Sequence, residues 1–397
     1  MISEAMKEQV SKSSVIRQMF EEGNRLAQLY GAENVFDFSL GNPNVAAPDS
    51  INESIIDIVK KTEPTKLHGY MNNSGFPEVR TKIADSINKR FGTDYDETSI
   101  CMCVGAAGGM NAILKAILNP GEEVVVMAPF FGEYKGYVSN YGGNLVVVPP
   151  NPPGFRPDVD QFSGYITEKT KAVIINTPNN PTGVIYSEED IRNIVKVLEK
   201  KKKEYGTDIA IISDEPYREL AYEGVEVPYI PNYYDDTFVC YSFSKSLSLP
   251  GERIGYIVVP NKMKSYGDVM TALSVATRIL GYVNAPSLMQ LVAGENTDAE
   301  VNLEAYDKNR KALYEGLTGL GFECVYPEGA FYLFVKSPIE DEKDFCEIAK
   351  RENILLVPGS AFGCPGYVRI AYCVSYDTII NSMDGFGKIA KSLGISD

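Results

Sequence analysis

The sequence has one histidine, no tryptophan and no long apolar run. Across 397 residues the single histidine is His68. A Ser-His-Asp triad would have to use it, and a histidine-rich metal site is excluded. No run approaches the ~18 apolar residues of a membrane span, and the N-terminus has no apolar signal-peptide core. We therefore expect a cytoplasmic protein that moves protons with Lys, Tyr or carboxylate side chains.

Basic residues are scarce relative to acidic ones, and the cysteines show no paired spacing. The chain has 38 Lys and Arg against 53 Asp and Glu, a net charge of −15. This charge argues against a nucleic-acid-binding surface and against attachment to anionic lipid. None of the seven cysteines has the spacing of a metal site. Cys101 and Cys103 lie two residues apart, on one face of an expected strand, and are interpreted as buried free thiols of a reducing compartment.

Hydrophobic residues make up 44% of the chain, enough for a large core. Between residues 101 and 260, short continuous apolar runs alternate with helical patterns. This alternation predicts an α/β fold with a mostly parallel sheet covered by helices on both faces. The expected strands are 101–104, 124–127, 145–148, 172–175, 209–212, 238–241 and 254–259.

The pattern changes after about residue 284. A long helical stretch with a break, 288–317, leads to short strands and a helix at 340–352. This arrangement is typical of a smaller α+β domain. Its expected strands are 322–325, 330–335, 354–357 and 367–372.

The segment Ser242–Tyr256 carries Lys245 among small hydroxyl residues, directly after the strand 238–241, and Arg253 follows eight residues later. Lysine can form a Schiff base with an aldehyde cofactor, and burial lowers its pKa enough for it to carry protons. The alternative is a solvated loop lysine. Ligands of parallel sheets bind beyond the carboxyl ends of the strands, where this lysine is expected.

Three further polar segments follow strand ends. Asn176–Gly183 is rich in Asn and Pro, with an ordinary turn as the alternative. Asp214 ends the strand 209–212, where a helix N-cap is the commoner role. Gly105–Gly109 opens a helix, and its small residues let backbone N–H groups approach an anion, although close helix–strand packing explains them equally well.

In this combination, from Phe36 to Tyr372, the sequence resembles the fold type I pyridoxal-5′-phosphate (PLP) enzymes, specifically the class I/II aminotransferases that include aspartate aminotransferases. The resemblance implies a large domain with a seven-stranded sheet and a smaller α+β domain. Residues 46–285 would form the large PLP-binding domain and residues 286–397 the small one. Residues 1–45 would pack with the small domain.

The resemblance also implies roles for single residues. Lys245 would hold PLP, Asp214 would keep the pyridine nitrogen protonated, and Tyr217 would reach the phenolic oxygen O3′; these three are the expected catalytic residues. Asn180 would also contact O3′, and Phe131 would stack on the ring, with core packing as the alternative. The expected phosphate contacts are Ala106 and Ala107 through their backbone, Ser242, Ser244 and Arg253.

Substrate and subunit contacts follow from the same resemblance. Arg369, inside an apolar strand, would clamp the α-carboxylate, with Gly41 and Asn180 facing the same group. Arg278 is a candidate for a side-chain carboxylate, although its spacing differs from that of relatives and a solvated helix arginine is the alternative. Arg17 is a candidate for a mobile lid. Tyr70 would reach the phosphate of a neighbouring subunit, which implies a homodimer with shared active sites.

The predicted function is transamination in amino-acid metabolism. An amino group would pass from an L-amino acid, by default aspartate, to a 2-oxo acid, by default 2-oxoglutarate, with ping-pong kinetics. A PLP-dependent cystathionine or cysteine-S-conjugate β-lyase would have the same cofactor residues. A PLP-sensing regulator is a remote alternative, because Gly41 comes too early to leave room for a preceding DNA-binding domain.

Overall fold

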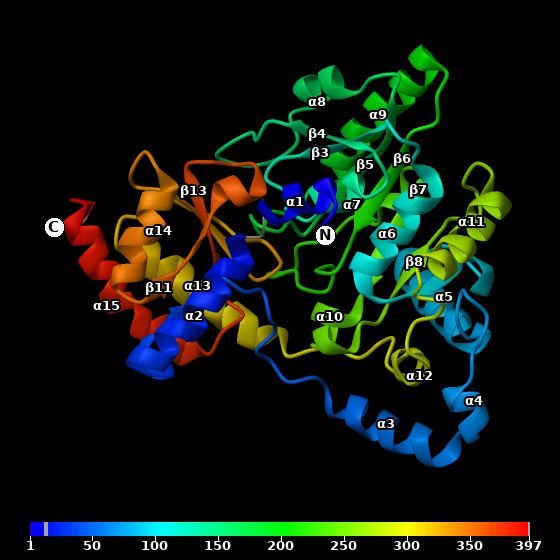
Figure 1. The fold of residues 1–397 in the computed structure, drawn as a ribbon, viewed down its shortest axis with the longest axis horizontal. Coiled ribbons are helices and arrows are strands. Elements are labelled where there is room, and N and C mark those ends of the chain that lie inside the picture. The colour runs from blue at the N-terminus through cyan, green and yellow to red at the C-terminus, as the bar shows by residue number, and fades with distance from the viewer. Residues whose placement is uncertain (12–14, 396–397) are drawn as a thin grey trace.

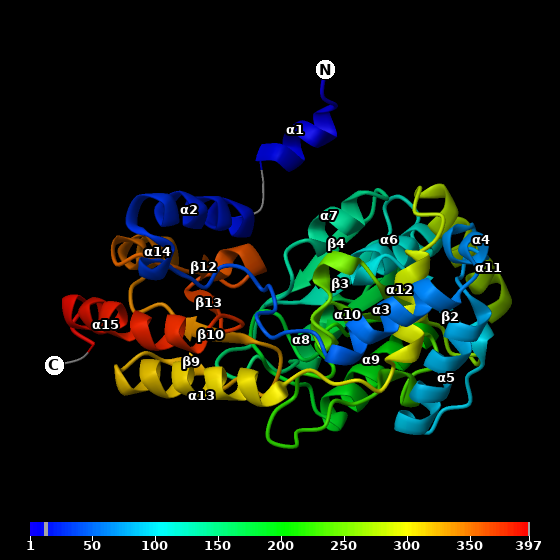
Figure 2. The ribbon, with the colours of Figure 1, turned by 90° about the horizontal axis from the view of Figure 1, so that it is seen from below.

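The structure, a computed structural model, describes residues 1–11 and 15–395. Two lobes lie side by side, a large one around a central sheet and a small one that contains the C-terminus (Figures 1 and 2). None of the helices in residues 1–11 and 15–395 combines the length and the apolar character that a membrane span needs.

The large lobe is built on seven strands in the order β2-β8-β7-β6-β5-β3-β4. All neighbouring strands are parallel except β8, which runs antiparallel to β2 and β7. The central strands consist almost wholly of buried apolar residues, as a sheet covered on both faces requires. The bounds are β2 Ile100–Cys103, β3 Glu123–Met127, β4 Asn144–Val148, β5 Thr170–Asn176, β6 Ala210–Asp214, β7 Thr237–Ser242 and β8 Gly255–Val258.

Helices cover both faces of this sheet, and the predicted fold class is confirmed. Helices α6 (Gly105–Ile117) and α11 (Tyr266–Ile279) pack on the face that contains Cys101 and Cys103. On the opposite face lie two groups of helices, one over each half of the sheet. These are α8 (Val159–Tyr165) with α9 (Glu188–Tyr205), and α3 (Asp49–Lys61) with α5 (Pro77–Phe91) and α12 (Ser287–Glu295). The remaining helices of the lobe are α4 (Pro64–His68), α7 (Tyr134–Ser139) and α10 (Phe243–Ser246).

The small lobe contains a four-stranded antiparallel sheet in the order β12-β13-β10-β9. One prediction was wrong here, because the single strand expected at 354–357 is divided between two sheets. Its first half, β11, pairs with a strand from the N-terminal segment, and its second half, β12, pairs with β13. The strands are β9 Cys324–Val325, β10 Tyr332–Lys336, β11 Ile354–Leu355, β12 Val357–Pro358 and β13 Tyr367–Ala371. The helices are α13 Leu303–Gly319, α14 Glu342–Arg351 and α15 Tyr376–Ser392.

Most of the N-terminal segment lies against the small lobe, but its first helix contacts the large lobe, where Gln9 Nε2 donates to Ser139 Oγ at 3.1 Å. Helix α1 (Glu4–Ser11) precedes α2 (Val15–Tyr30), which lies near α14 in both views (Figures 1 and 2). Strand β1 (Phe36–Asp37) pairs in parallel with β11. Phe38 is fully buried in the small-lobe core, with its ring centroid 6.3 Å from that of Phe386. We propose on these contacts that residues 15–45 fold with the small lobe. The small-domain boundary expected at residue 286 is too early, because α12 packs against α3 and α5 of the large lobe.

We expect Phe38→Ala to destabilise the small lobe by about 3–5 kcal/mol, because it removes a fully buried ring. Hydrogen exchange should then accelerate in β11 and α15 more than in the central sheet. Phe162→Ala is the matched control, since Phe162 is equally buried under the central sheet. Equal acceleration in both lobes for both variants would contradict the proposed division.

Candidate functional site

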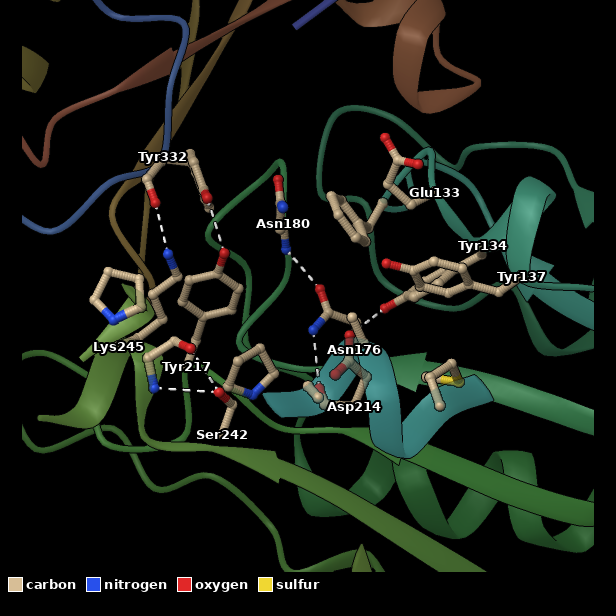
Figure 3. A pocket seen from close by; sticks show the side chains of 18 of the residues that line it. Glu133, Tyr134, Tyr137, Asn176, Asn180, Asp214, Tyr217, Ser242, Lys245 and Tyr332 are labelled. Carbon is tan, nitrogen blue, oxygen red and sulfur yellow. Dashed lines mark hydrogen bonds between the residues drawn. The ribbon is translucent and has the colours of Figure 1, made fainter. Parts of the chain in front are cut away.

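A cavity of about 360 Å³ lies beyond the carboxyl ends of the parallel strands, with residues of both lobes in its lining (Figure 3). Twelve of the residues singled out in the sequence line this cavity. They are Gly41, Ala106, Ala107, Phe131, Asn180, Asp214, Tyr217, Ser242, Ser244, Lys245, Arg253 and Arg369.

Lys245 lies on α10, the single helical turn that follows β7. Ser242 caps this turn by accepting a hydrogen bond from the backbone N–H of Ser244, at 3.2 Å. The Nζ atom of Lys245 donates to the carbonyl oxygen of Gly41, at 2.6 Å. Burial lowers the pKa of Lys245 to about 8, and the guanidinium groups of Arg253 and Arg369 act in the same direction. A useful fraction of this amine is therefore uncharged near neutral pH, as a nucleophile or proton carrier requires.

Asp214 is the last residue of β6 and lies deep in the cavity. One carboxylate oxygen accepts a short hydrogen bond from the hydroxyl of Tyr134. The other, Oδ1, is buried and has no partner among the described residues. Burial raises the pKa of Asp214 to about 7, although the bond from Tyr134 opposes the shift. A cationic N–H group entering the cavity would find an acceptor here and would hold the carboxylate in its charged form.

Asn180 and Arg369 connect the two lobes at the cavity wall. The backbone N–H of Asn180 donates to Oδ1 of Asn176 at 2.8 Å, and Asn176 Nδ2 donates to the backbone oxygen of Asp214 at 2.9 Å. The side-chain oxygen of Asn180 accepts from Arg369 Nη1, at 3.0 Å. Arg369 is 2% exposed, and its Nη2 donates to the carbonyl of Ser39 at 2.6 Å. Its Nε is buried without a partner in the described part of the chain, and each terminal nitrogen has a second N–H, so the guanidinium keeps donors for a carboxylate.

Tyr217 pairs with Tyr332, a residue that the sequence analysis did not assign to the site. Their hydroxyl oxygens are 2.8 Å apart, and the guanidinium of Arg369 lies 4.5 Å from the centre of the Tyr332 ring. A Cβ atom at position 41 would collide with the Tyr332 hydroxyl, so Gly41 is required there. In the sequence, Tyr332 lies in the otherwise apolar segment 330–335. A tyrosine in such a segment is more simply interpreted as a core residue, so the pattern did not indicate a site residue.

The opposite end of the cavity has the donors that an anion needs. The N-terminus of α6 begins at Gly105, whose φ of +71° favours glycine and whose added Cβ would lie 2.7 Å from Arg253 Nη2. Arg253 donates to the carbonyls of Pro250 and Val104, at 3.0 and 3.4 Å. The hydroxyls of Ser242 and Ser244 are 2.8 Å apart. Backbone N–H groups, hydroxyls and a guanidinium thus converge as they do around bound phosphate.

The loop after β3 supplies a further wall, and several of its residues were also missed. Phe131 is half-buried and lines the cavity, with its ring edge-on to Tyr134 at 5.6 Å between centroids. Glu133, Tyr134 and Tyr137 line the cavity beside it (Figure 3). A buried carboxylate requires a donor, and the tyrosine hydroxyls in the segment after β3, Tyr134 among them, were the available indication of one.

Three candidates are not brought into this cavity. Tyr70 is 93% exposed and borders a separate small cavity formed by residues 68–71 and 282–285 with Ser287. Arg278 is exposed in the last turn of α11. The side chain of Arg17 lies outside the described part of the structure.

Comparisons with known proteins agree on one family. The sequence profile described as "Aminotransferase class I and II" matches residues 33–383. The aspartate aminotransferase of Thermotoga maritima is 30% identical over 380 residues, covering 94% of this chain and 96% of that protein. The aromatic-amino-acid aminotransferase 2 of Thermococcus litoralis is 32% identical over 390 residues, with coverages of 95% and 96%.

Solved structures give the same result. An amino transferase from Eubacterium rectale superposes with a TM-score of 0.96 at 45% identity and covers 99% of each chain. The Thermus thermophilus aspartate aminotransferase with maleate superposes with a TM-score of 0.86 at 26% identity, covering 98% of this chain and 100% of that one.

The raised pKa of Asp214 predicts a pH-dependent stability of the protein without cofactor. The folded state keeps a proton that the unfolded state releases between the ordinary pKa of 3.8 and about 7, so this residue's contribution to stability falls as the pH rises through that window. Asp214→Asn should therefore raise the unfolding free energy at pH 8 by about 1–3 kcal/mol, and by less at pH 5.

Denaturant titrations at the two pH values, with and without the predicted cofactor, test this expectation. The cofactor should reverse the advantage of Asp214→Asn, because the wild-type carboxylate gains a cationic partner. Asp37→Asn is the matched control, since burial also raises the pKa of Asp37 but this residue does not line the cavity. An Asp214→Asn protein that is less stable at pH 8 than wild type would contradict the argument.

Proposed function

The chain belongs to the aminotransferase class I and II family and is an aminotransferase, and we propose that it uses PLP, bound in the cavity described above, to move an amino group from an L-amino acid to a 2-oxo acid. One observation carries the proposal. A buried lysine amine with a lowered pKa and a buried carboxylate with an unpaired oxygen line the same cavity. An aldehyde cofactor with a basic ring nitrogen would bind to both groups, because its aldehyde reacts with the amine and its protonated nitrogen pairs with the carboxylate.

The residues present fit PLP. Asp214 Oδ1 would accept the ring N–H, and Phe131 would lie against the ring. Asn180 and Tyr217 would face the phenolic oxygen. Ala106, Ala107, Ser242, Ser244 and Arg253 would hold the phosphate at the N-terminus of α6, where the helix dipole favours negative charge.

PLP supplies an electron sink that stabilises negative charge at the substrate Cα. The charged form of Asp214 is needed for this, and the cationic ring N–H would lower the pKa of the Asp214 carboxyl from its raised value. Arg369 orients the amino acid by its α-carboxylate. The amine of Lys245 would accept and return the proton of the substrate Cα, and positioned proton transfer of this kind is worth about 10²–10⁴-fold in rate.

Both half-reactions use this one site in turn, which gives ping-pong kinetics. Resemblance alone makes aspartate and 2-oxoglutarate the default pair. The named relatives include both aspartate and aromatic-amino-acid aminotransferases, so sequence similarity is consistent with more than one class of amino-group donor.

We also propose a homodimer that shares its active sites. Tyr70 is almost fully exposed, and nearby apolar side chains are exposed as well, including Tyr282 and Ile279 on one side and Ile56 and Val59 of α3 on another. A second subunit covering these surfaces would bury them and bring Tyr70 to the neighbouring phosphate site. The cytoplasmic location stays a prediction from the sequence.

Lys245→Ala should lower turnover by at least about 10²–10⁴-fold, because it removes the proton carrier, while some PLP stays bound through the phosphate contacts. Single-turnover kinetics and the absorbance spectrum of the bound cofactor measure the two effects separately. Lys264→Ala is the control, since Lys264 is exposed and pairs with Asp208. Full activity in Lys245→Ala would overturn the assignment.

A β-lyase on the same fold would share this cofactor site, so the reaction itself must separate the two. Holoenzyme incubated with L-cystathionine, without any 2-oxo acid, should form no pyruvate if it is a transaminase. Sustained pyruvate and ammonia release would favour the lyase. An amino acid that converts the cofactor to its amine form, reversed by a 2-oxo acid, supports the aminotransferase.

A further inference from the structure

The cavity lining contains three cationic side chains, Lys245, Arg253 and Arg369. On the proposed function, Lys245 is used by the cofactor aldehyde. Arg253 is fixed at the phosphate end by its bonds to the carbonyls of Pro250 and Val104. Among the lining residues of the described chain, Arg369 alone is left for a substrate carboxylate.

Arg369 has room for one carboxylate and is held in place. Each terminal nitrogen donates one of its two N–H groups, to Asn180 and to Ser39, and its Nε has no partner in the described part of the chain. The guanidinium lies between the rings of Tyr332 and Phe362, at 4.5 and 4.8 Å from their centroids. A guanidinium fixed on both faces cannot turn to serve a second, distant carboxylate, so it serves the α-carboxylate alone.

The rest of the lining suits an uncharged side chain. Leu40 and Tyr137 present apolar or aromatic surface to the cavity, and Glu133, an exposed residue, adds a carboxylate on the loop that also contains Phe131. Figure 3 shows Glu133 and Lys245 on opposite sides of the view. Burial raises the pKa of the Tyr137 hydroxyl, and the negative charge of Glu133 is the next largest cause. The electrostatic field of Glu133 therefore acts on a residue that lines the cavity.

We propose that this site selects monocarboxylic amino and 2-oxo acids with uncharged, apolar or aromatic side chains, and that Glu133 is a specificity-determining residue that disfavours acidic ones. The inference rests on the proposed function and departs from the default pair of aspartate and 2-oxoglutarate. A side-chain carboxylate would lose water, meet no free cation among the described residues that line the cavity and be repelled by Glu133. An aromatic side chain would gain contact with the apolar lining.

Equilibrium binding to the PLP-loaded enzyme gives a readout that does not depend on turnover. We expect 3-phenylpropionate to bind about tenfold more tightly than succinate in isothermal titration calorimetry. The second carboxylate of succinate would find no cation and would be repelled by Glu133, in a site that is partly solvated. In stopped-flow half-reactions, L-phenylalanine should exceed L-aspartate in kcat/KM by a similar factor. Succinate binding as tightly as 3-phenylpropionate would overturn the proposal.

Charge variants at position 133 test the residue itself. Glu133→Gln should raise succinate affinity about threefold and Glu133→Lys about tenfold, while the affinity for 3-phenylpropionate changes less than about twofold. Glu168→Lys is the matched control, since it makes the same charge change at an exposed residue that does not line the cavity. An unchanged ratio of the two affinities in both Glu133 variants would refute the role of Glu133.

Two further outcomes would also overturn the proposal. Arg278→Gln should leave succinate binding unchanged. A selective loss would mean that Arg278 of a second subunit supplies the missing cation. Faster reaction of L-lysine or L-ornithine than of L-phenylalanine would mean that Glu133 attracts a cationic side chain.

The proposed function and this inference fail in different ways. If no amino acid converts the bound cofactor to its amine form, the proposed function is wrong, and the inference, which depends on it, is wrong as well. If L-aspartate converts the cofactor faster than L-phenylalanine does, the aminotransferase proposal stands and the selectivity is wrong.

Discussion

The uncompensated burial of one carboxylate governs the rest of the site. Asp214 ends β6, the fourth of seven strands in the sheet, so neighbouring strand ends enclose it on both sides. Tyr134 satisfies one of its oxygens and nothing in the described chain satisfies the other. An unpaired buried charge destabilises a fold unless a partner arrives. The stability of the large lobe and the occupancy of its cavity are therefore thermodynamically linked.

The small lobe completes the site instead of merely covering it. Arg369 comes from β13 and Tyr332 from β10, two paired strands of the small sheet, and the segment with Gly41 runs beside them. Their contacts to Asn180, Tyr217 and Lys245 cross from one lobe to the other. A shift of one lobe relative to the other would change the substrate arginine and the lysine contact together.

The sequence predicted those parts of the protein that depend on local pattern. Continuous apolar runs identified the strands of the central sheet, and polar residues directly after them, such as Asp214 and Lys245, are now found around one cavity. Tyr332 and Glu133 could not be found this way, because their positions depend on which side chains of distant segments face the cavity. The division of 354–357 between two sheets was also hidden, since both halves have the same extended, apolar character. Tyr70 stays a prediction, because its expected role needs a second subunit, and Arg278 stays a candidate for a side-chain carboxylate although it is exposed outside the cavity.

The pairing of β1 with β11 also sets an order of assembly. Phe36 lies opposite Ile354, so most of the chain must be synthesised before this short parallel ladder can close. The central sheet, complete by Val258, can form earlier during translation, because its strands are nearer to one another in the chain. A nascent chain whose strand β13 has not yet emerged from the ribosome lacks a folded Arg369. Such a chain can bring the expected phosphate-binding residues together but cannot orient a substrate. Substrate orientation therefore depends on a strand that is synthesised near the end of the described chain.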